Sequence, residues 1–451
     1  MRSAPLTLLL SAFLCAIGCS DGGDGGGETG GGDVDATSGT GGAPGVTTGT
    51  TGATTGTGGA PGVTTGTTGA TTGTGGAPGV TTGTTGTGGA DGTGGGTGGS
   101  DGNTGGGGST EGPAERTPAA SASTLREAGE KANPPLLIGA AISASGLNDG
   151  NYSRVAAAEH NYVTAENEMK WDALEPNPGQ FSWGSADRIV SWAQQNNMKV
   201  KGHTLVWHSQ LPGWMNNLRG AQQVEQAMRR HIENVMGHFK GKVEHWDVVN
   251  EAVLTDSDTG VGNPRMRPTV FYNELGEEYL DLAFKIAREQ DPSVKLYYND
   301  YSIDARNDKA DFVYEMIKGM VERGVPIDGV GFQMHIGPPN NEAGGADVAY
   351  NLKRFADLGL EVLISEMDIN RCGNQVTAEE QLTYYHDIVE ACFLMPKCVA
   401  VTFWGINDGR SWLNSWQTAM CNGGNSQSLL FNDQYQKKET YNRVMDALLG
   451  R

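Results

Sequence analysis

The chain after about Ser121 alternates between short apolar runs and amphipathic segments, and eight such pairs precede the C-terminus. The apolar runs are rich in β-branched residues, which favour strands, and the amphipathic segments have the spacing of helices with one buried face. Eight strand–helix units fit a closed α/β fold, the (β/α)8 TIM barrel, better than an open doubly wound sheet. A glycine-rich dinucleotide fingerprint after the first predicted strand is also lacking, which argues further against the open sheet.

The predicted elements are spread along residues 121–451. Strands are expected at Leu137–Ala141, Tyr162–Ala165, Lys199–Val206, Glu244–Val249, Lys295–Tyr298, Gly329–Phe332, Glu361–Ser365 and Val399–Phe403. The clearest helices are expected at Ala186–Asn196, Val224–Phe239, Tyr279–Glu289, Asp308–Glu322, Glu379–Leu394 and Tyr441–Leu449. All nine tryptophans lie at or after Trp171, so the aromatic side chains for a core or a ligand groove belong to this block.

The first quarter of the chain is rich in Gly and Thr, and its residues 41–57 recur at 58–74 and again, in part, from Gly75. A solenoid of stacked repeats is the alternative structure for such a period. Each repeat offers only Val and a few Ala for burial, which is far too little to offset the backbone entropy lost on folding. We therefore predict a disordered Gly/Thr-rich linker over residues 20–120, whose threonines are candidate sites for O-glycans.

The N-terminus has the features of an export signal: one Arg, an apolar run too short to cross a bilayer, and small residues before Cys19. Residues 16–19 (AIGC) are similar to a lipoprotein lipobox, although Leu is usual where Ala16 stands. Residues 1–19 are thus predicted to be a signal peptide, which either leads to lipidation of Cys19 or is simply cleaved. The protein is expected to be exported, as a cell-surface lipoprotein or a secreted protein, and to touch a membrane only through this lipid.

Charge and cysteine content narrow the classes of partner. The net charge is −20, and residues 117–451 alone hold 43 acidic and 30 basic residues. Nucleic acid is not an expected partner, because counterion release needs clustered Lys and Arg.

Four cysteines remain after Cys15 and Cys19, and an even number in an exported protein favours disulfides. Their spacings do not suit zinc, so we predict no metal site and no cofactor, and we expect a monomer.

The predicted strand ends are unusually polar, and in a barrel of this kind catalytic groups gather where strands end and loops begin. These ends include Glu166–Trp171, His203–His208, Trp246–Glu251, Tyr298–Asp300, Gln333–His335, Ser365–Asp368 and Phe403–Gly405. Side chains alternate along a strand. The inward face is therefore expected to hold His203 with Trp207, Asp247 with Glu251, Gln333 with His335, and Glu366 with Asp368.

Two carboxyls, those of Glu251 and Glu366, are expected to converge on one cleft. Such a pair suits acetal hydrolysis, in which one group protonates the leaving oxygen and the other attacks or activates water. One must stay protonated near neutrality while the other stays ionised, and neighbouring charges and hydrogen bonds separate their pKa values. A surface salt bridge is the alternative role for either acid, but an acid that closes an apolar strand is rarely only that.

The motifs at these strand ends resemble glycoside hydrolase family 10, the endo-β-1,4-xylanases, over about residues 124–450. The matching segments follow the family order: TAENEMKW at 164–171, GHTLVWHSQLP at 202–212, WDVVNEA at 246–252, GFQMH at 331–335 and ISEMDI at 364–369. The resemblance implies a TIM barrel that performs endo-acting, retaining hydrolysis of β-1,4-xylosidic bonds in xylan by double displacement. Residues 121–451 are then the catalytic domain, and xylan is the expected partner.

Carried over residue by residue, the resemblance makes Glu251 the acid/base and Glu366 the nucleophile. It places the amide of Asn250 on the sugar 2-hydroxyl, and it places His335, oriented by Asp368, beside the nucleophile. The implied substrate-binding residues are Glu166, Asn167, Lys170, His203 (paired with Asp247), Trp207, Gln210, Trp404 and Trp412, with Asn299 and Gln333 at polar cleft positions. Met334 and Ser365 depart from the family's usual Ser and Thr, but alternation turns both away from the cleft.

The four remaining cysteines are expected to form two disulfides. The six-residue spacing of Cys392 and Cys398 suits closure of a local loop and resembles a bridge known in the family. Cys372 and Cys421 are then left to pair, in neighbouring loops on the catalytic face.

Two other functions remain as alternatives. A cellobiohydrolase or mixed β-1,4-glucanase on the same barrel is one, because a site that accepts xylose can admit glucose if the C5 substituents fit. A non-catalytic polysaccharide-binding surface lipoprotein is the other, and the intact pair of Glu251 and Glu366 argues against it. For three single residues the alternative to a place at the site is a place in the core. These residues are His208, Trp404 and Trp412.

Overall fold

The computed structural model describes residues 115–451 except 258–259, 338–342, 375, 417–420 and 422–423. The predicted signal peptide and nearly all of the predicted linker lie outside the described residues, so both stay predictions. In the part of the chain that the structure describes, no helix is long and apolar enough to cross a membrane.

Eight parallel strands form a closed barrel, which confirms the predicted fold class. They are β1 (Leu137–Ile142), β2 (Tyr162–Ala165), β3 (Lys199–Gly202), β4 (His245–Asn250), β7 (Lys295–Asp300), β8 (Gly329–Phe332), β10 (Glu361–Ile369) and β11 (Cys398–Phe403). Neighbouring strands pair in chain order, and β11 pairs with both β1 and β10, which closes the ring. The short β9 (His335–Ile336) pairs with the last residues of β10.

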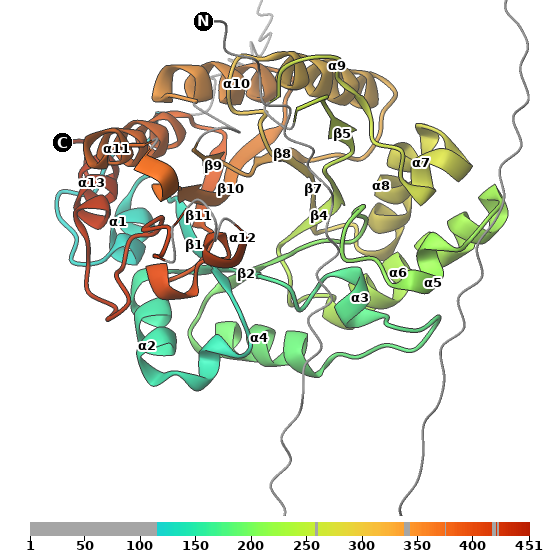
Figure 1. Cartoon of the computed structure of the whole chain (residues 1–451), viewed down its shortest axis with the longest axis horizontal. Helices are drawn as coiled ribbons and strands as arrows, with labels where there is room; N and C mark the ends of the chain where they lie inside the picture. The colour runs from blue at the N-terminus through green and yellow to red at the C-terminus, as the bar shows by residue number, and fades with distance from the viewer. Residues whose placement is uncertain (1–114, 258–259, 338–342, 375, 417–420, 422–423) are drawn as a thin grey trace, which may run out of the picture. The chain divides into compact units, whose positions relative to one another are not determined.

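Helices surround the barrel on the outside (Figure 1). They are α1 (Leu125–Lys131), α2 (Gly150–Glu159), α3 (Trp171–Leu174), α4 (Gly184–Gln195), α5 (Gly213–Asn216), α6 (Ala221–Phe239), α7 (Val270–Leu275), α8 (Glu278–Gln290), α9 (Asp308–Glu322), α10 (Gly345–Asp357), α11 (Ala378–Leu394), α12 (Leu413–Trp416) and α13 (Glu439–Leu448). The short α12 is the exception, since it lies over the strand ends and its Leu413 lines the cavity there (Figure 1). The buried faces of the other helices pack on the strands and contribute to the main core. The last helix, α13, lies beside α1, so the two ends of the described chain meet on one side of the barrel (Figure 1).

The interior of the barrel changes from apolar to polar along the strands. Near the N-terminal ends, Tyr162, Tyr297, Leu363 and Ala400 form a separate, fully buried cluster. Gly329 makes room for it, since a Cβ at that position would lie 2.3 Å from the Tyr297 ring. Polar side chains follow at the C-terminal ends, so the strands themselves place the candidate site at that end of the barrel.

Both predicted disulfides are present in the structure. Cys392 and Cys398 close the turn between α11 and β11. Cys372 and Cys421 join the loop after β10 to the loop after β11. The second bridge therefore ties together two loops at the end of the barrel that carries the polar residues.

A buried arginine secures the start of the described chain. Arg116 donates hydrogen bonds to the carbonyl oxygens of Pro134 at 2.9 Å, Phe393 at 2.8 Å and Cys398 at 2.7 Å. Pro134 precedes β1 and Cys398 begins β11, so both acceptors lie at the N-terminal ends of strands. The described chain thus begins at the end of the barrel opposite to the polar strand ends.

The predicted bounds of β2, β8 and α9 agree with the observed ones, but the prediction for β3 was too long. This strand ends at Gly202, whereas the sequence predicts a strand to Val206. Leu205 and Val206 are buried and still donate backbone hydrogen bonds to the next strand, to the carbonyls of Asp247 and Val248. The apolar pattern therefore continues although the regular strand has ended.

Candidate active site

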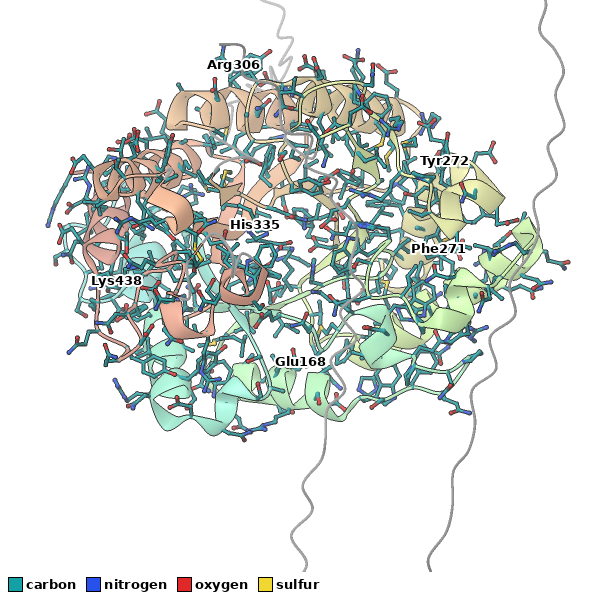
Figure 2. All side chains as sticks on the ribbon, viewed as in Figure 1. Glu168, Phe271, Tyr272, Arg306, His335 and Lys438 are labelled. Carbon is teal, nitrogen blue, oxygen red and sulfur yellow. A yellow bond between two sulfur atoms is a disulfide. The ribbon has the colours of Figure 1, made fainter. Side chains whose placement is uncertain are left out.

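A cavity of about 480 Å³ opens at the C-terminal ends of the strands, with His335 near the centre of the ring (Figure 2). Fourteen of the fifteen predicted catalytic and binding residues line it: Glu166, Asn167, Lys170, His203, Trp207, Gln210, Asn250, Glu251, Gln333, His335, Glu366, Asp368, Trp404 and Trp412. Asn299, the remaining one, is fully buried behind the cavity wall, where its amide contacts Asn250 and Glu366.

Glu366 extends from β10 and is 4% exposed. Its Oε1 accepts a hydrogen bond from Nδ2 of Asn299 at 2.7 Å, and its Oε2 lies 3.3 Å from Nε2 of His335. Burial raises the pKa of this carboxyl, but His203 and His335 lower it more, and the net pKa lies below its usual value. The carboxyl is therefore held ionised, which is the form that can attack carbon.

His335 lies between two carboxylates. Its Nδ1 is 2.9 Å from Oδ1 of Asp368, whose Oδ2 accepts a hydrogen bond from Nε1 of Trp412 at 2.8 Å. Burial lowers the pKa of His335, but Asp368 and Glu366 raise it to about 10. The ring is therefore a cation near neutral pH, and both of its nitrogens donate.

Glu251 directly follows β4 and has a φ of 57°, in the left-handed region. Its Oε1 accepts hydrogen bonds from Nδ2 of Asn250 at 3.1 Å and Nε2 of Gln333 at 2.9 Å, and Nδ1 of His208 lies 3.6 Å from its Oε2. Burial raises the pKa of Glu251, but His208 and Gln333 lower it, and the net pKa lies below its usual value. The expectation that one of the two carboxyls stays protonated near neutrality is therefore wrong for this structure, because these neighbours outweigh the effect of burial at Glu251 as others do at Glu366. His208 acts in this way only while its ring is protonated, so its charge controls the pKa of Glu251.

A chain of amides joins the two carboxyls. Nδ2 of Asn299 donates both to Glu366 and to Oδ1 of Asn250 at 2.9 Å, and Asn250 in turn donates to Glu251. Ser365 was expected to face away from the cleft, and it is not among the lining residues. Its hydroxyl nevertheless donates to Oδ1 of Asn299 at 2.6 Å, which fixes the direction in which that amide points.

His203 is held by a buried ion pair below it. Its Nδ1 lies 2.8 Å from Oδ2 of Asp247, and Lys201 contacts the same oxygen. Burial raises the pKa of Asp247, but Lys201 and His203 lower it, so the carboxyl is ionised. The bond to Asp247 fixes the orientation of the ring at the cavity that His203 lines. Lys201 was not predicted, because nothing in the sequence separates it from the other Lys residues around β3.

The residues after β2 form one polar wall of the cavity. Nζ of Lys170 donates to Oδ1 of Asn167 at 2.9 Å and lies 4.9 Å from the centre of the Trp207 ring. Nε2 of Gln210 donates to the same Asn167 oxygen at 3.4 Å. Burial raises the pKa of Glu166 to about 7, against the opposing charge of Lys170. This wall therefore offers carboxyl, amide and ammonium groups to a hydroxyl-rich ligand.

Two tryptophans from the region after β11 complete the cavity. The Trp404 ring meets the His203 ring edge-on at 5.4 Å, and the Trp412 ring lies 5.1 Å from that of His335. Both line the cavity rather than a separate core. Aromatic rings in such a groove are suited to stack on the apolar faces of sugars.

The comparison with protein families decides which family this barrel represents. The model of glycosyl hydrolase family 10 matches residues 124–447, from the first helix of the barrel into the last. The chain belongs to glycosyl hydrolase family 10. It is therefore a retaining glycoside hydrolase, which confirms the family resemblance of its sequence motifs.

Several family 10 relatives are similar over most of their length. Endo-1,4-beta-xylanase 3 of Hypocrea jecorina is 38% identical over 315 residues, which are 69% of this chain and 82% of that protein. Endo-1,4-beta-xylanase B of Thermotoga neapolitana is 38% identical over 329 residues, which cover 72% and 91%. Among solved structures, xylanase 10B from Thermotoga petrophila in complex with xylobiose is 38% identical, with a TM-score of 0.65 over 73% of this chain and 98% of that one.

Nine lining residues of this family 10 cavity were not among the predicted catalytic and binding residues, and they include Arg267, Tyr301 and Ser302. Tyr301 and Ser302 directly follow the last residues of β7, so a longer reading of that strand end would have included them. Arg267 follows β6 (Arg265–Met266), which pairs antiparallel with β5 (Val253–Leu254). It is this hairpin that brings Arg267 back to Glu251, and the sequence shows no signal for it.

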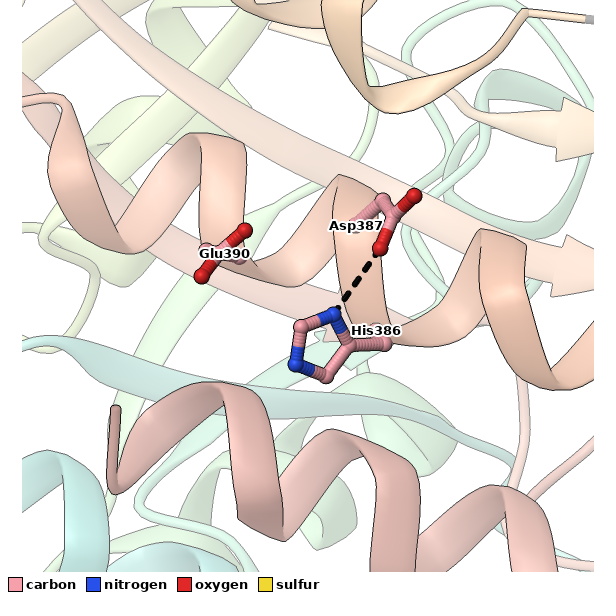
Figure 3. A group of neighbouring side chains, drawn as sticks. All are labelled: His386, Asp387 and Glu390. Carbon is pink, nitrogen blue, oxygen red and sulfur yellow. Dashed lines mark hydrogen bonds and ion pairs between the residues drawn. The ribbon is translucent and has the colours of Figure 1, made fainter. Parts of the chain in front are cut away.

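Two other groups of acids lie apart from the cavity. Glu168, a further acid in the segment after β2, lies outside the centre of the barrel (Figure 2), and its carboxylate accepts backbone N–H bonds from Ala144 and Asn167. Among the described residues, one cluster has the donor types of a metal site: His386, Asp387 and Glu390 on α11 (Figure 3). Both ring nitrogens of His386 are already engaged, with Asp387 at 2.9 Å and the carbonyl of Arg451 at 3.1 Å.

Proposed function

We propose that this family 10 enzyme hydrolyses β-1,4-xylosidic bonds within xylan chains, with Glu366 as nucleophile and Glu251 as acid/base. The observation that carries the proposal is that the two carboxyls share one cavity and are joined through the amides of Asn250 and Asn299. Xylan is the proposed substrate because relatives 38% identical are named endo-1,4-beta-xylanases, and a related structure holds xylobiose.

The reaction proceeds through two displacements at the same carbon. In the first, a carboxylate oxygen of Glu366 attacks the anomeric carbon, Glu251 gives its proton to the glycosidic oxygen, and the bond to the leaving chain breaks. In the second, Glu251 takes a proton from water, and the resulting hydroxide displaces Glu366 from the sugar. Two inversions at one carbon leave the product in its original β configuration.

Neighbouring side chains support each step. The imidazolium of His335, held by Asp368, keeps Glu366 ionised before attack. The amide of Asn250 is suited to the sugar 2-hydroxyl, in a hydrogen bond that strengthens as positive charge develops on the ring. The polar wall around Lys170 and the rings of Trp404 and Trp412 bind the sugar units beside the bond that is cut.

Reducing-sugar release from xylan and from carboxymethylcellulose tests the substrate. We expect rapid release from xylan, little from carboxymethylcellulose, and none from xylan with Glu366→Ala. Equal rates on both polymers would favour the glucanase alternative. Binding of xylan without any release would favour the non-catalytic lipoprotein, and either result contradicts the proposal.

The stereochemistry and the nucleophile are tested together. Proton NMR of the first product formed should show the β anomer, because the family retains configuration. Glu366→Ala should be inactive, and azide should restore turnover of an activated aryl xylobioside with an α-glycosyl azide as product. Full activity of Glu366→Ala without azide contradicts the assignment.

We also propose that residues 1–19 are an export signal, residues 20–120 a linker and residues 121–451 the catalytic domain of a monomer. Lipidation of Cys19 and plain cleavage make different predictions for Cys19→Ala. With lipidation, this change moves the enzyme from the membrane fraction to the medium. With plain cleavage, the enzyme is in the medium with or without the change.

A further inference from the structure

The peptide unit between Glu251 and Ala252 is held on both of its sides. Nε of Arg267 donates to the carbonyl oxygen of Glu251 at 2.9 Å. On the opposite side, the N–H of Ala252 donates to the phenolic oxygen of Tyr298 at 3.2 Å. The N–H of Glu251 itself donates to the carbonyl of Asn299 at 2.9 Å. The N–H and the carbonyl of Glu251 and the N–H of Ala252 therefore all have fixed partners.

Glu251 needs such restraint because its φ of 57° is unfavourable for a residue with a side chain. A non-glycine residue in this region persists only where its surroundings impose the conformation. The left-handed turn after β4 sends the chain away from the strand and leaves the carboxyl in the cavity. A rotation of this peptide unit would therefore move the carboxyl away from the position of a glycosidic oxygen.

The two groups that hold the peptide unit are linked to each other through a buried ion pair. The hydroxyl of Tyr298 donates to Oδ2 of Asp300, and Nζ of Lys309 donates to Oδ1 of the same carboxylate at 2.7 Å. The ammonium of Lys309 lies 3.3 Å from the centre of the Tyr301 ring. The hydroxyl of Tyr301 accepts a hydrogen bond from Arg267 at 2.9 Å, which completes the circuit. Tyr298, Asp300 and Lys309 are all 0% exposed.

We propose that this circuit, from Arg267 through Tyr301, Lys309 and Asp300 to Tyr298, positions Glu251 for proton transfer. The inference rests on the proposed function, because it assigns a task to the surroundings of the proposed acid/base. Tyr298 is buried and does not line the cavity, so it has no contact with the sugar and its direct contact with the acid/base segment is the hydrogen bond from the backbone N–H of Ala252. It is a positioning residue, and the ion pair beneath it keeps its hydroxyl directed.

Tyr298→Phe removes the hydroxyl and keeps the ring. Its effect is measured as kcat/KM for a series of aryl xylobiosides whose phenols differ in pKa but little in size. A displaced acid harms poor leaving groups most, since an activated phenol departs without protonation. We expect kcat/KM to fall about 30-fold or more for the least activated substrate and about threefold or less for the most activated one. The plot of log kcat/KM against phenol pKa therefore becomes steeper.

Tyr297→Phe is the matched control. Tyr297 is the adjacent residue of β7 and is equally buried, but its hydroxyl donates to Glu361 at 2.6 Å, at the start of β10. Tyr297→Phe therefore removes a buried tyrosine hydroxyl, as Tyr298→Phe does, but this hydroxyl is not part of the circuit. We expect Tyr297→Phe to keep the wild-type slope, even if its melting temperature falls as far as that of Tyr298→Phe.

Arg267 provides a second, independent variant if Tyr298→Phe does not fold. Arg267→Met should steepen the same plot, and Arg267→Lys, which retains a donor, should bring the slope part of the way back. Because the phenols have nearly the same size, any sugar or phenol contact of Arg267 shifts all points together and leaves the slope unchanged. A parallel shift without a change of slope overturns the proposal.

The same experiment distinguishes a failure of the proposed function from a failure of the positioning role. If the wild-type enzyme cleaves none of the aryl xylobiosides, the proposed function fails and the positioning role fails with it. If the wild type cleaves them and the Tyr298 and Arg267 variants keep the wild-type slope, only the positioning role is wrong.

Discussion

Glu251 and Glu366 line the same cavity but have different cationic neighbours. Glu366 contacts His335, whose pKa of about 10 keeps the ring charged through the neutral range. Glu251 lies 3.6 Å from His208, whose ring is 28% exposed and contributes a positive charge only when protonated. The ionisation of Glu366, the proposed nucleophile, is thus fixed by a ring that stays charged, whereas that of Glu251, the proposed acid, depends on a partly exposed histidine.

This difference leads to a prediction for the pH profile. In the proposed mechanism Glu251 is protonated in the first step, so we expect activity to fall as the pH rises through the pKa of Glu251. His208 lowers that pKa, and His208→Asn removes the charge and therefore raises it. We expect the basic limb of the kcat/KM profile to move to higher pH, while the acidic limb, set by Glu366, stays in place. A basic limb that moves to lower pH contradicts this role of His208.

Variants of Glu251, the proposed acid/base, and of Asn250, its neighbour on β4, should respond differently to the leaving group. Glu251→Ala should slow xylan hydrolysis by about 100-fold or more but an activated aryl xylobioside far less. Asn250→Ala should lower kcat for both, because its hydrogen bond to the 2-hydroxyl strengthens in the transition state whatever leaves. Initial rates on the two substrates are the measurement. If Glu251→Ala slows both equally and keeps the normal pH profile, another carboxyl is the acid; Glu168 lies apart from the cavity, so Glu166, which lines it and has a pKa raised to about 7, is the first to test.

At the scale of single elements, Arg116 joins the first described residues to the turn between α11 and β11. Arg116→Met leaves the buried carbonyl oxygens of Pro134, Phe393 and Cys398 without this donor. We expect a loss of about 2–4 kcal/mol in the free energy of unfolding, because several buried acceptors lose a charged partner at once. Urea denaturation measures it. Arg154→Met, which removes an exposed arginine on α2, is the control and should change stability by less than about 0.5 kcal/mol.

How much of each element the sequence predicts depends on how regular the element is. β2 and β8 are short apolar runs that end at polar residues, and α9 begins at the N-cap Asn307, so all three are predicted at their observed bounds. β10 continues to Ile369, four residues beyond the predicted Ser365, because its last residues pair with β9. Such pairing depends on contacts from a distant part of the chain, which no local pattern contains.

The same distinction explains which cavity residues were predicted. Those at strand ends lie where the barrel itself directs them, so alternation and the family motifs identify them. Arg267 reaches the cavity through a hairpin, and Lys201 acts on His203 only through Asp247. These two roles come from tertiary contacts, and the amino-acid type alone does not separate them from ordinary surface cations.

At the scale of the whole molecule, the described chain begins on the far side of the barrel from the cavity. An enzyme that lacks residues 1–114 but keeps Arg116 should therefore retain kcat/KM on a soluble aryl xylobioside within about twofold, since no described contact of the cavity is removed. Purified full-length and shortened enzymes are compared at equal active-site concentration. A loss of tenfold or more contradicts the placement of the cavity away from this end.

The tyrosine cluster inside the barrel has a consequence for how a polymer is handled. Tyr162 and Tyr297, with Leu363 and Ala400, fill the interior of the barrel below the cavity, so no channel passes between these side chains. A long glycan therefore cannot pass through the barrel. It can only bind across the C-terminal ends of the strands, with the bond to be cut nearest to the barrel axis. Both product chains then remain outside the barrel interior, and each can dissociate directly into solvent without passing along a tunnel.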